Sequence, residues 1–550
     1  MELTRRQWLL SALALAGCPA APALPAGLRG GIVGPSDLRG HQVRRRHSLP
    51  APSLRWRTEV AILGGGISGL SAAWALRRAG LEDLLVLELE DAPGGTSGWA
   101  PGPVSPRPWG AHYLPVPSQH QRAVCTLLSE LGVLQGFDAA GRAICAEEAL
   151  CRAPQERIFY KGRWYEGLYL RAGASAEDLR QLDRFHAEVG RWVRARGTGG
   201  QRVFTLPSAL GDRQAASELD RMTFADWLRG LGLTSSRLRF YADYACRDDF
   251  GLPASATSAW AGVHYFAARL LHPDDRPPEV LTWPEGNGWL VQQLAHPLGD
   301  RLRTGCVVLQ VHPLVEAREG AEVVFLHGEQ TGRLRARHVI FALPAFLRRH
   351  LLPPAHAAPA WLEAFQYSPW LVANLTLRNL PVPPGTRSPV PGFPLCWDNV
   401  LVDSPSLGYV VATHQREPPP PPDGVPRSAW TWYLPLGEGH PAEQRARLLQ
   451  TPWQSWVRLL LQDLGRAEPD LAARLERVDL YRWGHAMVRP VPGLFTSGVL
   501  ERAAAPLGPI HFAHTDLAGM ALFEEAQHAG VRAAEAVMAA RGHPFEALSS

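Results

Sequence analysis

Lysine is almost missing from this chain of 550 residues. Of the 56 basic residues, one is a lysine, Lys161, and the other 55 are arginines. A GC-rich genome explains this bias more simply than a function does, but the bias leaves almost no lysine for catalysis. Net charge is also small, at +4 for this length, which gives no reason to expect nucleic acid as a partner.

Cysteines are few, and none are spaced like metal ligands. Six lie beyond Cys18, and the nearest two are Cys145 and Cys151. Without a close cysteine pair or a constellation of metal ligands elsewhere, we expect no metal site. Disulfides and buried free thiols both stay open for these six residues, which are Cys125, Cys145, Cys151, Cys246, Cys306 and Cys396.

The first 18 residues are expected to be a targeting signal and no part of the folded domain. Thr4 to Leu10, with Arg5 and Arg6, resembles a twin-arginine export signal, and the apolar stretch up to Ala16 is too short to span a bilayer. The sequence at Cys18 resembles a lipoprotein cleavage site. We therefore expect an exported, periplasmic or extracytoplasmic protein that is anchored to a membrane through a lipidated Cys18. The alternative is an ordinary secretory signal with a chance cysteine.

The rest of the chain is long enough for two domains, and its hydrophobic content of 46% can supply a sizeable core. Residues 19–55 are rich in Pro, Gly, Ala and Arg without a sustained period, which is typical of a linker. Apolar spacing predicts helices over 122–135, 176–196 and 217–232.

Beyond residue 346 the pattern mixes strands with one helix. The strands are expected over 370–378, 407–413 and 429–436, and the helix near 442–465. Pro418 to Pro422 is a run of five prolines, which predicts a stiff exposed loop.

A strand, a glycine turn, a helix and a second strand follow one another between Arg57 and Glu90. Val60–Leu63 is the first strand and Leu84–Leu87 the second, which ends in Glu88. The residues expected to form the turn and to open the helix are Gly64, Gly66, Ile67, Ser68 and Gly69. This order is typical of a dinucleotide-binding unit, in which the carboxylate accepts hydrogen bonds from ribose hydroxyls.

Each glycine of this turn has a physical reason. Gly64 permits a tight turn, Gly66 lets the backbone approach a pyrophosphate, and Gly69 lets the helix pack closely on the strand. The helix N-terminus offers free N–H groups and the positive end of a dipole to the phosphates. The alternative is a glycine-rich turn in another kind of α/β protein.

Several later segments extend this pattern. A second glycine pair, Gly94–Gly95, precedes Thr96, and Gly110 follows in Trp109 to Tyr113. Residues 301–343 alternate like paired strands and end in Ala342-Leu343-Pro344. Near the C-terminus, a strand ends in Asp516, and a helix opens around Phe523 and runs to about Ala540.

Together these segments resemble the flavin-containing amine oxidase superfamily, which includes phytoene desaturase-like proteins. The resemblance covers 57–115, 282–345 and 505–542, and it implies an α/β fold with a discontinuous Rossmann-like FAD-binding domain. Residues 116–281 and 346–504 would then form an inserted α+β substrate domain. No cysteine lies just ahead of Pro509, where related enzymes attach flavin covalently, so the FAD is expected to be non-covalent.

The resemblance also assigns roles to single residues. Val308, with Val307 close by, would hold the adenine through its backbone, and Ala342 would lie in the turn under the flavin. Asp516 would contact the ribityl–pyrophosphate region, and the backbone of Phe523 would face the flavin N1–C2=O edge, where a helix dipole favours the anionic reduced flavin.

Two positions depart from the family pattern. His514 stands where a glycine is usual. The lysine that many amine oxidases keep near flavin N5 is absent, and Ala373 or Asn374 takes its place. That loss puts fast oxidation by oxygen in doubt, so the electron acceptor is either oxygen or a membrane or periplasmic carrier.

Four residues are candidates for a catalytic role. Trp483 would line the substrate cage and His485 would titrate near neutrality, while His112 and Tyr113 follow the glycine that approaches the flavin. For all four the alternative is simple packing. Residues 241–250 gather three carboxylates with aromatic residues, which suits a cation, although a solvated or salt-bridged helix face is favoured there. Asp398 and its neighbours are weaker candidates.

The function expected from these features is FAD-dependent oxidation of a C–N bond in a small amine, with polyamines among the candidates. Hydride would pass to flavin N5. One alternative is desaturation of an apolar or lipid substrate. Another is a lipoprotein that binds FAD without catalysis.

Overall fold

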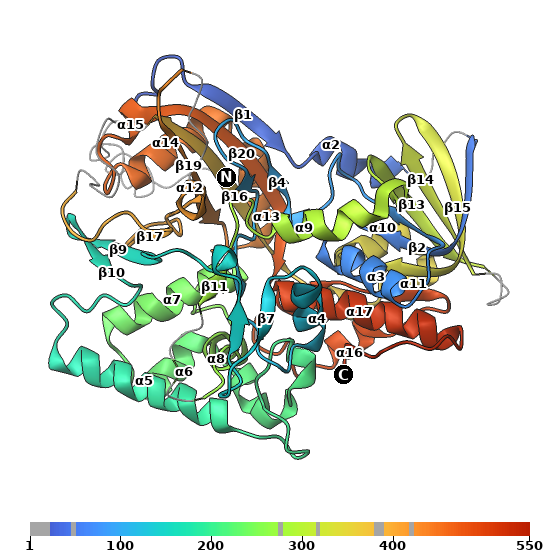
Figure 1. The fold of residues 1–550 in the computed structure, drawn as a ribbon, viewed down its shortest axis with the longest axis horizontal. Helices are drawn as coiled ribbons and strands as arrows, with labels where there is room; N and C mark the ends of the chain where they lie inside the picture. The colour runs from blue at the N-terminus through green and yellow to red at the C-terminus, as the bar shows by residue number, and fades with distance from the viewer. Residues whose placement is uncertain are drawn as a thin grey trace, which may run out of the picture.

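The computed structural model describes residues 22–45, 51–272, 275, 279–314, 320–378, 390–416 and 423–550. The expected signal, Cys18 and the five-proline run lie outside these residues. In the view of Figure 1, the described chain divides into two halves, each built around one large sheet.

The first sheet contains the predicted dinucleotide unit. Its strands are β2 (Leu54–Leu63), β3 (Leu84–Leu87), β12 (Leu302–Arg303), β13 (Cys306–Pro313), β14 (Ala321–His327), β15 (Gln330–Phe341) and β21 (Ile510–Phe512). β12, β3, β2, β15 and β21 run parallel, and β13 and β14 extend β15 as an antiparallel meander. Every strand falls within the three segments expected to bind FAD or at their margin, which confirms the predicted α/β class.

Two helices pack together against this sheet. α3 (Ile67–Arg78) follows β2, and α17 (Phe523–Ala540) follows β21, with bounds close to those predicted. A methyl group on Gly530 of α17 would lie 2.1 Å from the carbonyl oxygen of Ser68, so the two backbones approach as closely as glycine permits. Both helices begin at the carboxyl edge of the parallel strands, where α/β proteins bind their ligands.

The second sheet has eight strands. In spatial order they are β1 (Arg29–Gly34), β20 (Leu475–Val488), β16 (Tyr367–Arg378), β19 (Arg427–Pro435), β18 (Tyr409–Val411), β17 (Asp398–Leu401), β9 (Glu156–Tyr160) and β10 (Arg163–Glu166). β1 lies in the segment expected to be a linker, yet it pairs in parallel with β20. The described part of 19–55 thus differs from a plain linker, because its backbone joins the sheet of the second half.

The longer helices outside the first sheet lie partly in the lower half of Figure 1 and partly beside the two sheets. They are α4 (Arg122–Glu130), α5 (Ala176–Arg194), α6 (Phe224–Gly230), α7 (Ser236–Phe250), α8 (Ala259–Ala267), α9 (Gly288–Ala295), α13 (Pro441–Gln450) and α14 (Trp453–Leu464). The single helix expected near 442–465 is wrong in one respect. Pro452 cannot continue a helix, so it separates α13 from α14.

Short elements connect these parts. They are β4 (Trp99–Ala100), β5 (Arg107–Pro108), β6 (Leu114–Pro115), β7 (Leu134–Phe137), β8 (Ala143–Cys145), β11 (Val280–Leu281), α2 (Asp37–Gly40), α10 (Arg348–Leu351), α11 (Pro354–Ala357), α12 (Ala412–Gln415), α15 (Leu471–Arg474) and α16 (Val499–Ala504). All six cysteines of the described residues are free, three of them buried and three half-buried.

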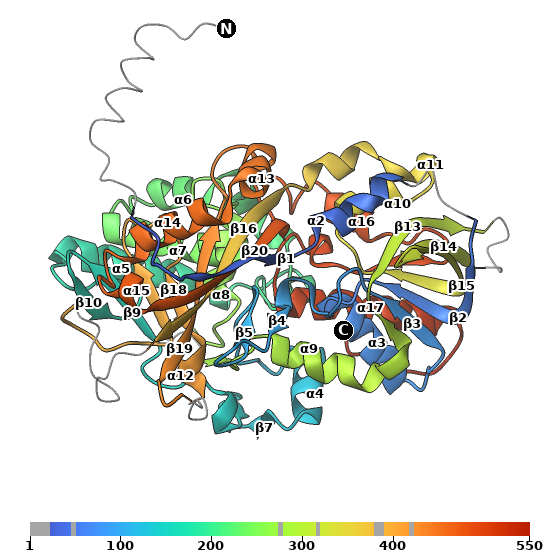
Figure 2. The same cartoon turned by 90° about the horizontal axis from the view of Figure 1, so that it is seen from above.

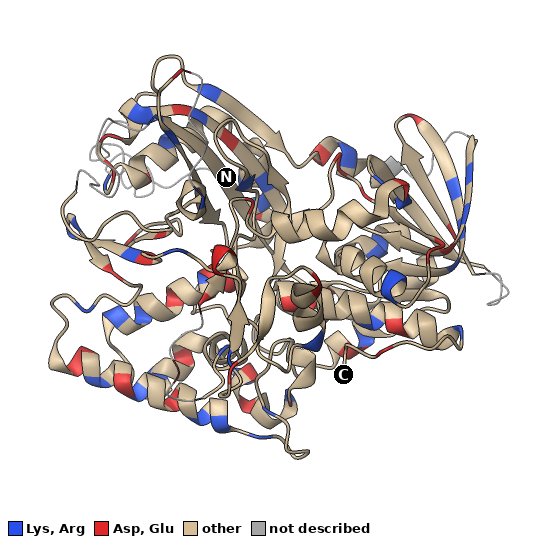
Figure 3. Cartoon of the chain, viewed as in Figure 1, with Lys and Arg blue, Asp and Glu red and all other residues tan. Residues whose placement is uncertain are grey.

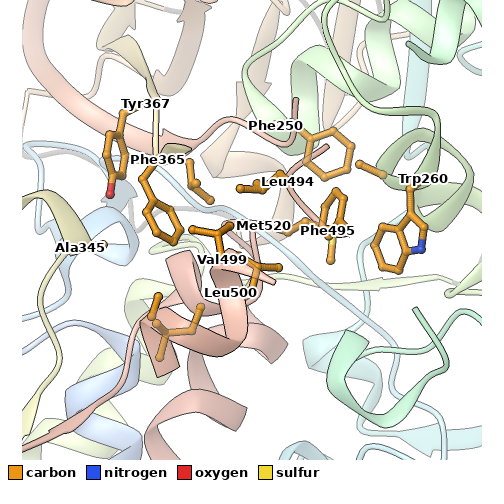
Figure 4. Close-up of a cluster of buried hydrophobic side chains, with 14 of the residues drawn as sticks. Phe250, Trp260, Ala345, Phe365, Tyr367, Leu494, Phe495, Val499, Leu500 and Met520 are labelled. Carbon is orange, nitrogen blue, oxygen red and sulfur yellow. The ribbon is translucent and has the colours of Figure 1, made fainter. Parts of the chain in front are cut away.

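One hydrophobic core joins the two halves. It runs from Leu63 and Phe341 in the first sheet to Phe185 and Phe250 in the helices. Figure 4 shows its centre, where Phe250 and Trp260 of the helical layer face Phe495 and Val499. The ring centroids of Trp260 and Phe495 lie 4.3 Å apart. The halves therefore share buried surface, which fixes the position of the substrate half against the cofactor half.

Charged residues of both signs lie on both halves (Figure 3). Seen from above, the two sheets stand on opposite sides of the molecule, and the segments that link them pass through the middle (Figure 2). The site described below lies where these linking segments meet.

Candidate functional site

The first glycine turn is as tight as its sequence predicts. Gly64 has a φ of 101°, and a methyl group on Gly69 would lie 1.9 Å from the Gly64 carbonyl oxygen. A methyl group on Gly66 would meet no atom within 4 Å. Ile67 and Ser68 open α3, whose N-cap position at Gly66 offers no side-chain bond to the helix. The turn thus presents free amides to an open space, which is what a bound phosphate requires.

Glu88 lies at the end of β3, beside this turn. Its Oε2 accepts a hydrogen bond of 2.7 Å from the amide of Gly65, and its Oε1 accepts one of 2.8 Å from Glu90. Burial raises the pKa of Glu88 to about 7, and the amide bonds oppose that rise. The glycine turn therefore holds in place the carboxyl group that is predicted to accept hydrogen bonds from the ribose hydroxyls.

The second glycine pair packs on the first turn. The amide of Gly94 donates to the carbonyl of Gly65 at 2.8 Å, and a methyl group on Gly95 would lie 3.5 Å from the Cα of Gly66. Gly94 and Gly95 both have positive φ, at 133° and 54°. These backbone conformations favour glycine, which explains why glycine occupies both positions.

Thr96 connects this pair to the segment 108–112. Its carbonyl accepts a bond of 2.9 Å from the amide of Ala111, and a methyl group on Gly110 would lie 2.2 Å from the same oxygen. The close approach that Gly110 makes in the described residues is to the backbone of Thr96, and its approach to the flavin stays a prediction.

Five consecutive carbonyl groups of the segment 108–112 are each held by a donor. The donors, in order along the segment, are Asn374 Nδ2 (2.9 Å), Trp483 Nε1 (2.6 Å), Tyr433 Oη (3.0 Å), the Asn287 amide (3.1 Å) and Thr282 Oγ1 (2.7 Å). They come from separate parts of the chain, so no single element fixes the segment. Such fixation reduces the reorganisation needed when a ligand binds beside it.

Trp483 therefore has a different environment from the one that its sequence alone suggests. Its indole N–H is engaged by Trp109, and its ring lies 4.7 Å from that of Tyr481. His485, two residues further along β20, stacks on Phe346 with centroids 4.2 Å apart. The imidazole is exposed on one side, yet the protein around it desolvates it and lowers its pKa to about 4. Titration near neutrality, expected for His485, does not agree with this lowered value.

β13 passes close to Glu88. The amide of Cys306 donates to the Glu88 carbonyl at 2.8 Å, and Val308 follows just before an irregularity in the strand. Ala342, at the end of β15, donates its amide to Leu63 at 2.9 Å, and its carbonyl lies against Gly64. Val308 and Ala342 are thus brought to the same edge as the glycine turn.

Asp516 is the acid that follows β21, and it is buried. Its Oδ2 accepts bonds of 2.7 Å from the amide of Ala345 and 2.6 Å from the hydroxyl of Tyr367. Burial alone would raise its pKa, but His514 and the two donors together lower it. Oδ1 has no hydrogen-bond donor in the described residues, although His514 Nδ1 lies 3.1 Å away.

Phe523 begins α17, and no side chain caps that helix. Free helix N-termini at α3 and α17, the open space before Gly66 and the unsatisfied Asp516 oxygen lie at one edge of the sheet. This set of donors and acceptors fits a dinucleotide with a flavin at one end.

Carboxyl groups and aromatic rings gather on the other side of the segment 108–112. Tyr113 donates its hydroxyl to Asp248 at 3.1 Å and lies 3.4 Å from Asp249. Tyr244 donates to Asp398 at 3.0 Å. The solvated face allowed for at 241–250 is wrong for Asp248, because its carboxyl group accepts a bond from Tyr113 and α7 turns this end towards the protein interior. The salt bridge allowed for in that expectation is present at Asp249.

His112 is the last residue of the segment 108–112, and its ring lies next to the aromatic residues of this cluster. Its ring stacks on Tyr433 with centroids 4.8 Å apart and lies 5.3 Å from Trp397. Burial lowers the pKa of His112 to about 4, so the imidazole is neutral at pH 7. A neutral ring among aromatic neighbours forms a wall for a cationic ligand and does not repel it.

A cavity of about 460 Å³ adjoins the cluster. Arg269 lies in its wall and donates to Asp249 at 2.5 Å. The mouth also carries Asp275 and Glu279. Arg269 was not anticipated from the sequence, since it follows an apolar helix with no motif around it.

The position of the expected lysine is filled by an amide. Asn374 is buried, and besides its bond to Pro108 it accepts one of 2.7 Å from Thr431. Ala373 packs in the core of the opposite face. Lys161 lies in the exposed turn between β9 and β10. No group of His, Cys, Asp or Glu among the described residues could hold a metal ion.

A model of the family described as flavin containing amine oxidoreductase matches residues 67–538. In Mycobacterium tuberculosis (strain H37Rv), the protein provisionally named flavin-containing monoamine oxidase AofH is 27% identical over 296 residues. That alignment covers 52% of this chain and 57% of the relative, so the chain matches little more than half of the relative's length.

Solved structures share the fold. Wild-type putrescine oxidase bound to putrescine superposes with a TM-score of 0.63 at 19% identity, over 88% of this chain and 100% of the other. Cyclohexylamine oxidase from Brevibacterium oxydans IH-35A gives a TM-score of 0.59 at 17% identity, over 88% and 99%. At these identities the likeness is one of architecture.

Proposed function

This chain belongs to the flavin containing amine oxidoreductase family, whose cofactor is FAD, and we propose that it oxidises the C–N bond of a small cationic amine. The observation that carries the proposal is the cluster of buried carboxyl groups and aromatic rings beside the segment 108–112. Such a lining stabilises an ammonium group and is a poor environment for a hydrocarbon, which weighs against the desaturase alternative.

FAD, when bound, supplies the acceptor for the hydride that leaves the carbon next to the amine nitrogen, and the resulting imine is hydrolysed. The residues of the chain bind and orient the amine. Because amines of this kind are protonated at pH 7, one proton must leave the nitrogen first. Asp248, which accepts a bond from Tyr113, can take that proton, since burial raises its pKa to about 7.

We assign Trp483 and Tyr433 as positioning residues, because their donors hold the carbonyls of Trp109 and Gly110. His112 and Tyr113 would line the amine cavity, and His485 would lie beside the flavin as a neutral ring. The roles of Glu88, Val308, Asp516 and the glycines towards FAD follow from the same arrangement of the sheet edge.

The electron acceptor is proposed to be either oxygen or a carrier in the membrane or periplasm. Asn374 stands where the expected lysine is missing, and this favours an acceptor other than oxygen. Its Nδ2 donates to Pro108 and its Oδ1 accepts from Thr431, and the neutral amide has no cationic group of the kind that the missing lysine would place near the flavin.

Anaerobic stopped-flow absorbance on purified protein tests the proposal. We expect putrescine or cyclohexylamine, the compounds named for the structural neighbours, to bleach the flavin, and oxygen to restore it slowly. Acid precipitation should release all flavin into solution, because no covalent bond holds it. A flavin that stays oxidised with every mono-, di- and polyamine tried would refute amine oxidation.

We also infer export and anchoring through a lipidated Cys18, supported by Arg5, Arg6 and the sequence before that cysteine. No helix in the described residues is long and apolar enough to cross a membrane. In cell fractionation, the full chain should sediment with membranes and a Cys18→Ala variant should be soluble after export. Recovery of both forms from the cytoplasm would contradict the inference.

A further inference from the structure

The carboxyl cluster contains more negative charge than one ammonium group needs. Asp248 and Asp249 end α7, Asp398 begins β17, Glu156 begins β9, and Glu524 lies in the first turn of α17. β17 and β9 pair in parallel with Asp398 and Glu156 in register, so these two like charges are direct neighbours.

Only one cation among the described residues reaches the cluster. Arg269 pairs with Asp249, whereas no ion pair of the described chain involves Asp248, Asp398 or Glu156. The charges that act on Asp398 are those of Glu156 and Asp248, and both are negative. Arg157 follows Glu156 in sequence but points to the other face of β9, where it pairs with Glu468 at 3.1 Å.

Glu524 adds an independent observation. Its side chain is 3% exposed, and its Oε1 has no hydrogen-bond partner in the described residues. Outside its own helix, the charges of Arg269 and Asp249 act on its pKa. A buried, unsatisfied carboxyl oxygen is costly unless a ligand supplies the missing donor.

The neutral groups around the cluster are donors and aromatic faces. The hydroxyls of Tyr113 and Tyr244 are already used by Asp248 and Asp398, so they cannot neutralise further charge. Trp397 and Tyr433 supply ring faces next to His112. Arg269, which pairs with Asp249, also lines the cavity of about 460 Å³.

We propose that this cluster binds a substrate with at least two ammonium groups, a diamine or polyamine, whose non-reacting ammonium lies between Asp398 and Glu156, while Asp248 stays with the reacting nitrogen. The inference rests on the proposed amine oxidation and adds the substrate class. The reacting nitrogen would lie nearer to the segment 108–112, with the aromatic rings along the carbon chain between the two charges.

Proton balance supports this arrangement. Burial raises the pKa of Glu156 to about 7, and burial together with the repulsion of neighbouring carboxylates raises the pKa of Asp248 to about 7 and that of Asp398 as well. A carboxyl with a raised pKa in the folded state contributes stability at low pH that is lost as the pH rises through that raised value. For Glu156 this window lies between 4.5 and about 7. A bound dication would restore this lost stability, because its ammonium groups would take the place of the protons on the carboxyl groups.

The test compares cadaverine with n-pentylamine, which has the same carbon chain and one ammonium fewer. Anaerobic flavin reduction at varied amine concentration yields the dissociation constant and the limiting rate separately. We expect cadaverine to bind on the order of 100-fold more tightly than n-pentylamine in the wild type, because a second charge is paired in a buried site.

Asp398→Asn and Glu156→Gln keep the side-chain shape and remove one charge each. Each should weaken cadaverine binding by on the order of 10-fold or more and leave n-pentylamine binding within about threefold, with limiting rates little changed. The matched control is Asp183→Asn on the exposed face of α5, which should change neither. Because both cluster variants remove like-charge repulsion, they should melt no lower than wild type at pH 8.

The outcomes separate the two proposals. Equal affinity for the two amines in the wild type, or an equal loss for both amines in the variants, would overturn the second ammonium site while amine oxidation stands. No bleaching by either amine, or by any other amine, would remove amine oxidation itself. Lower melting temperatures for both variants would show that the carboxyl groups serve the fold instead.

Discussion

Replacing Gly66 with alanine is expected to yield a folded protein that purifies without flavin. Gly66 has φ −77° and ψ −179°, a conformation open to alanine, and a methyl group there meets no protein atom within 4 Å. The fold should therefore tolerate the change. The methyl group would instead occupy the space in front of the free amides of α3, where the pyrophosphate of FAD must approach.

The measurement is the ratio of flavin to protein absorbance, together with a thermal unfolding curve of the apoprotein. Gly69→Ala is the contrasting variant, because its methyl group would overlap the Gly64 carbonyl and should disrupt both fold and binding. Gly31→Ala on β1 is the neutral control, since that position is equally open and lies on the other sheet. A Gly66→Ala protein with full flavin content would show that the pyrophosphate lies elsewhere.

The cofactor half could be predicted from the sequence because its requirements are local. Gly64 and Gly69 are dictated by the backbone within a few residues, and Glu88 follows a strand that hydrophobicity alone reveals. The acid after β21 and the helix from Phe523 have the same local character. In each case the residue type is required by its immediate neighbours, which is what a sequence pattern records.

The substrate side could not be predicted in this way because its contacts join distant segments. Asp248 meets Tyr113 across 135 residues, and Asp398 meets Tyr244 across 154. Nothing local distinguishes Asp248 from an acid on a solvated helix face, and nothing local marks Asp398 as more than a weak candidate. The pairing of Glu156 with Asp398 depends on the register of two strands that are far apart in sequence.

β1 and Trp483 illustrate two further limits. A strand that joins a sheet edge through backbone hydrogen bonds needs no hydrophobic periodicity. For this reason the sequence of residues 19–55 indicated only a linker and did not reveal β1. Trp483 was expected to wall the substrate cage, and its N–H proves to hold the carbonyl of Trp109. A sequence shows that a tryptophan is present, but the partner of its single donor depends on the tertiary fold.

Replacing Asp516 with alanine is expected to destabilise the protein and to abolish flavin retention. The change leaves the amide of Ala345 and the hydroxyl of Tyr367 buried without an acceptor, at about 1–3 kcal/mol each. It also removes Oδ1, the acceptor left free for a ligand. Asp516→Asn keeps a carbonyl oxygen and the same volume, so it should lose roughly half as much stability. Unchanged melting and flavin content in the alanine variant would contradict both roles.

The pH dependence of stability isolates the charge of Asp516. Its pKa is lowered in the folded state, so the carboxylate contributes stability above its unfolded value of 3.8 that is lost as the pH falls through the lowered value. His514 Nδ1 lies 3.1 Å from Oδ1 and 3.2 Å from the Asp516 amide, and it can donate to the first only when protonated. Below pH 4, the wild type should therefore lose stability more steeply than Asp516→Asn in denaturant titrations, whereas parallel curves would show that the carboxylate carries no special charge interaction.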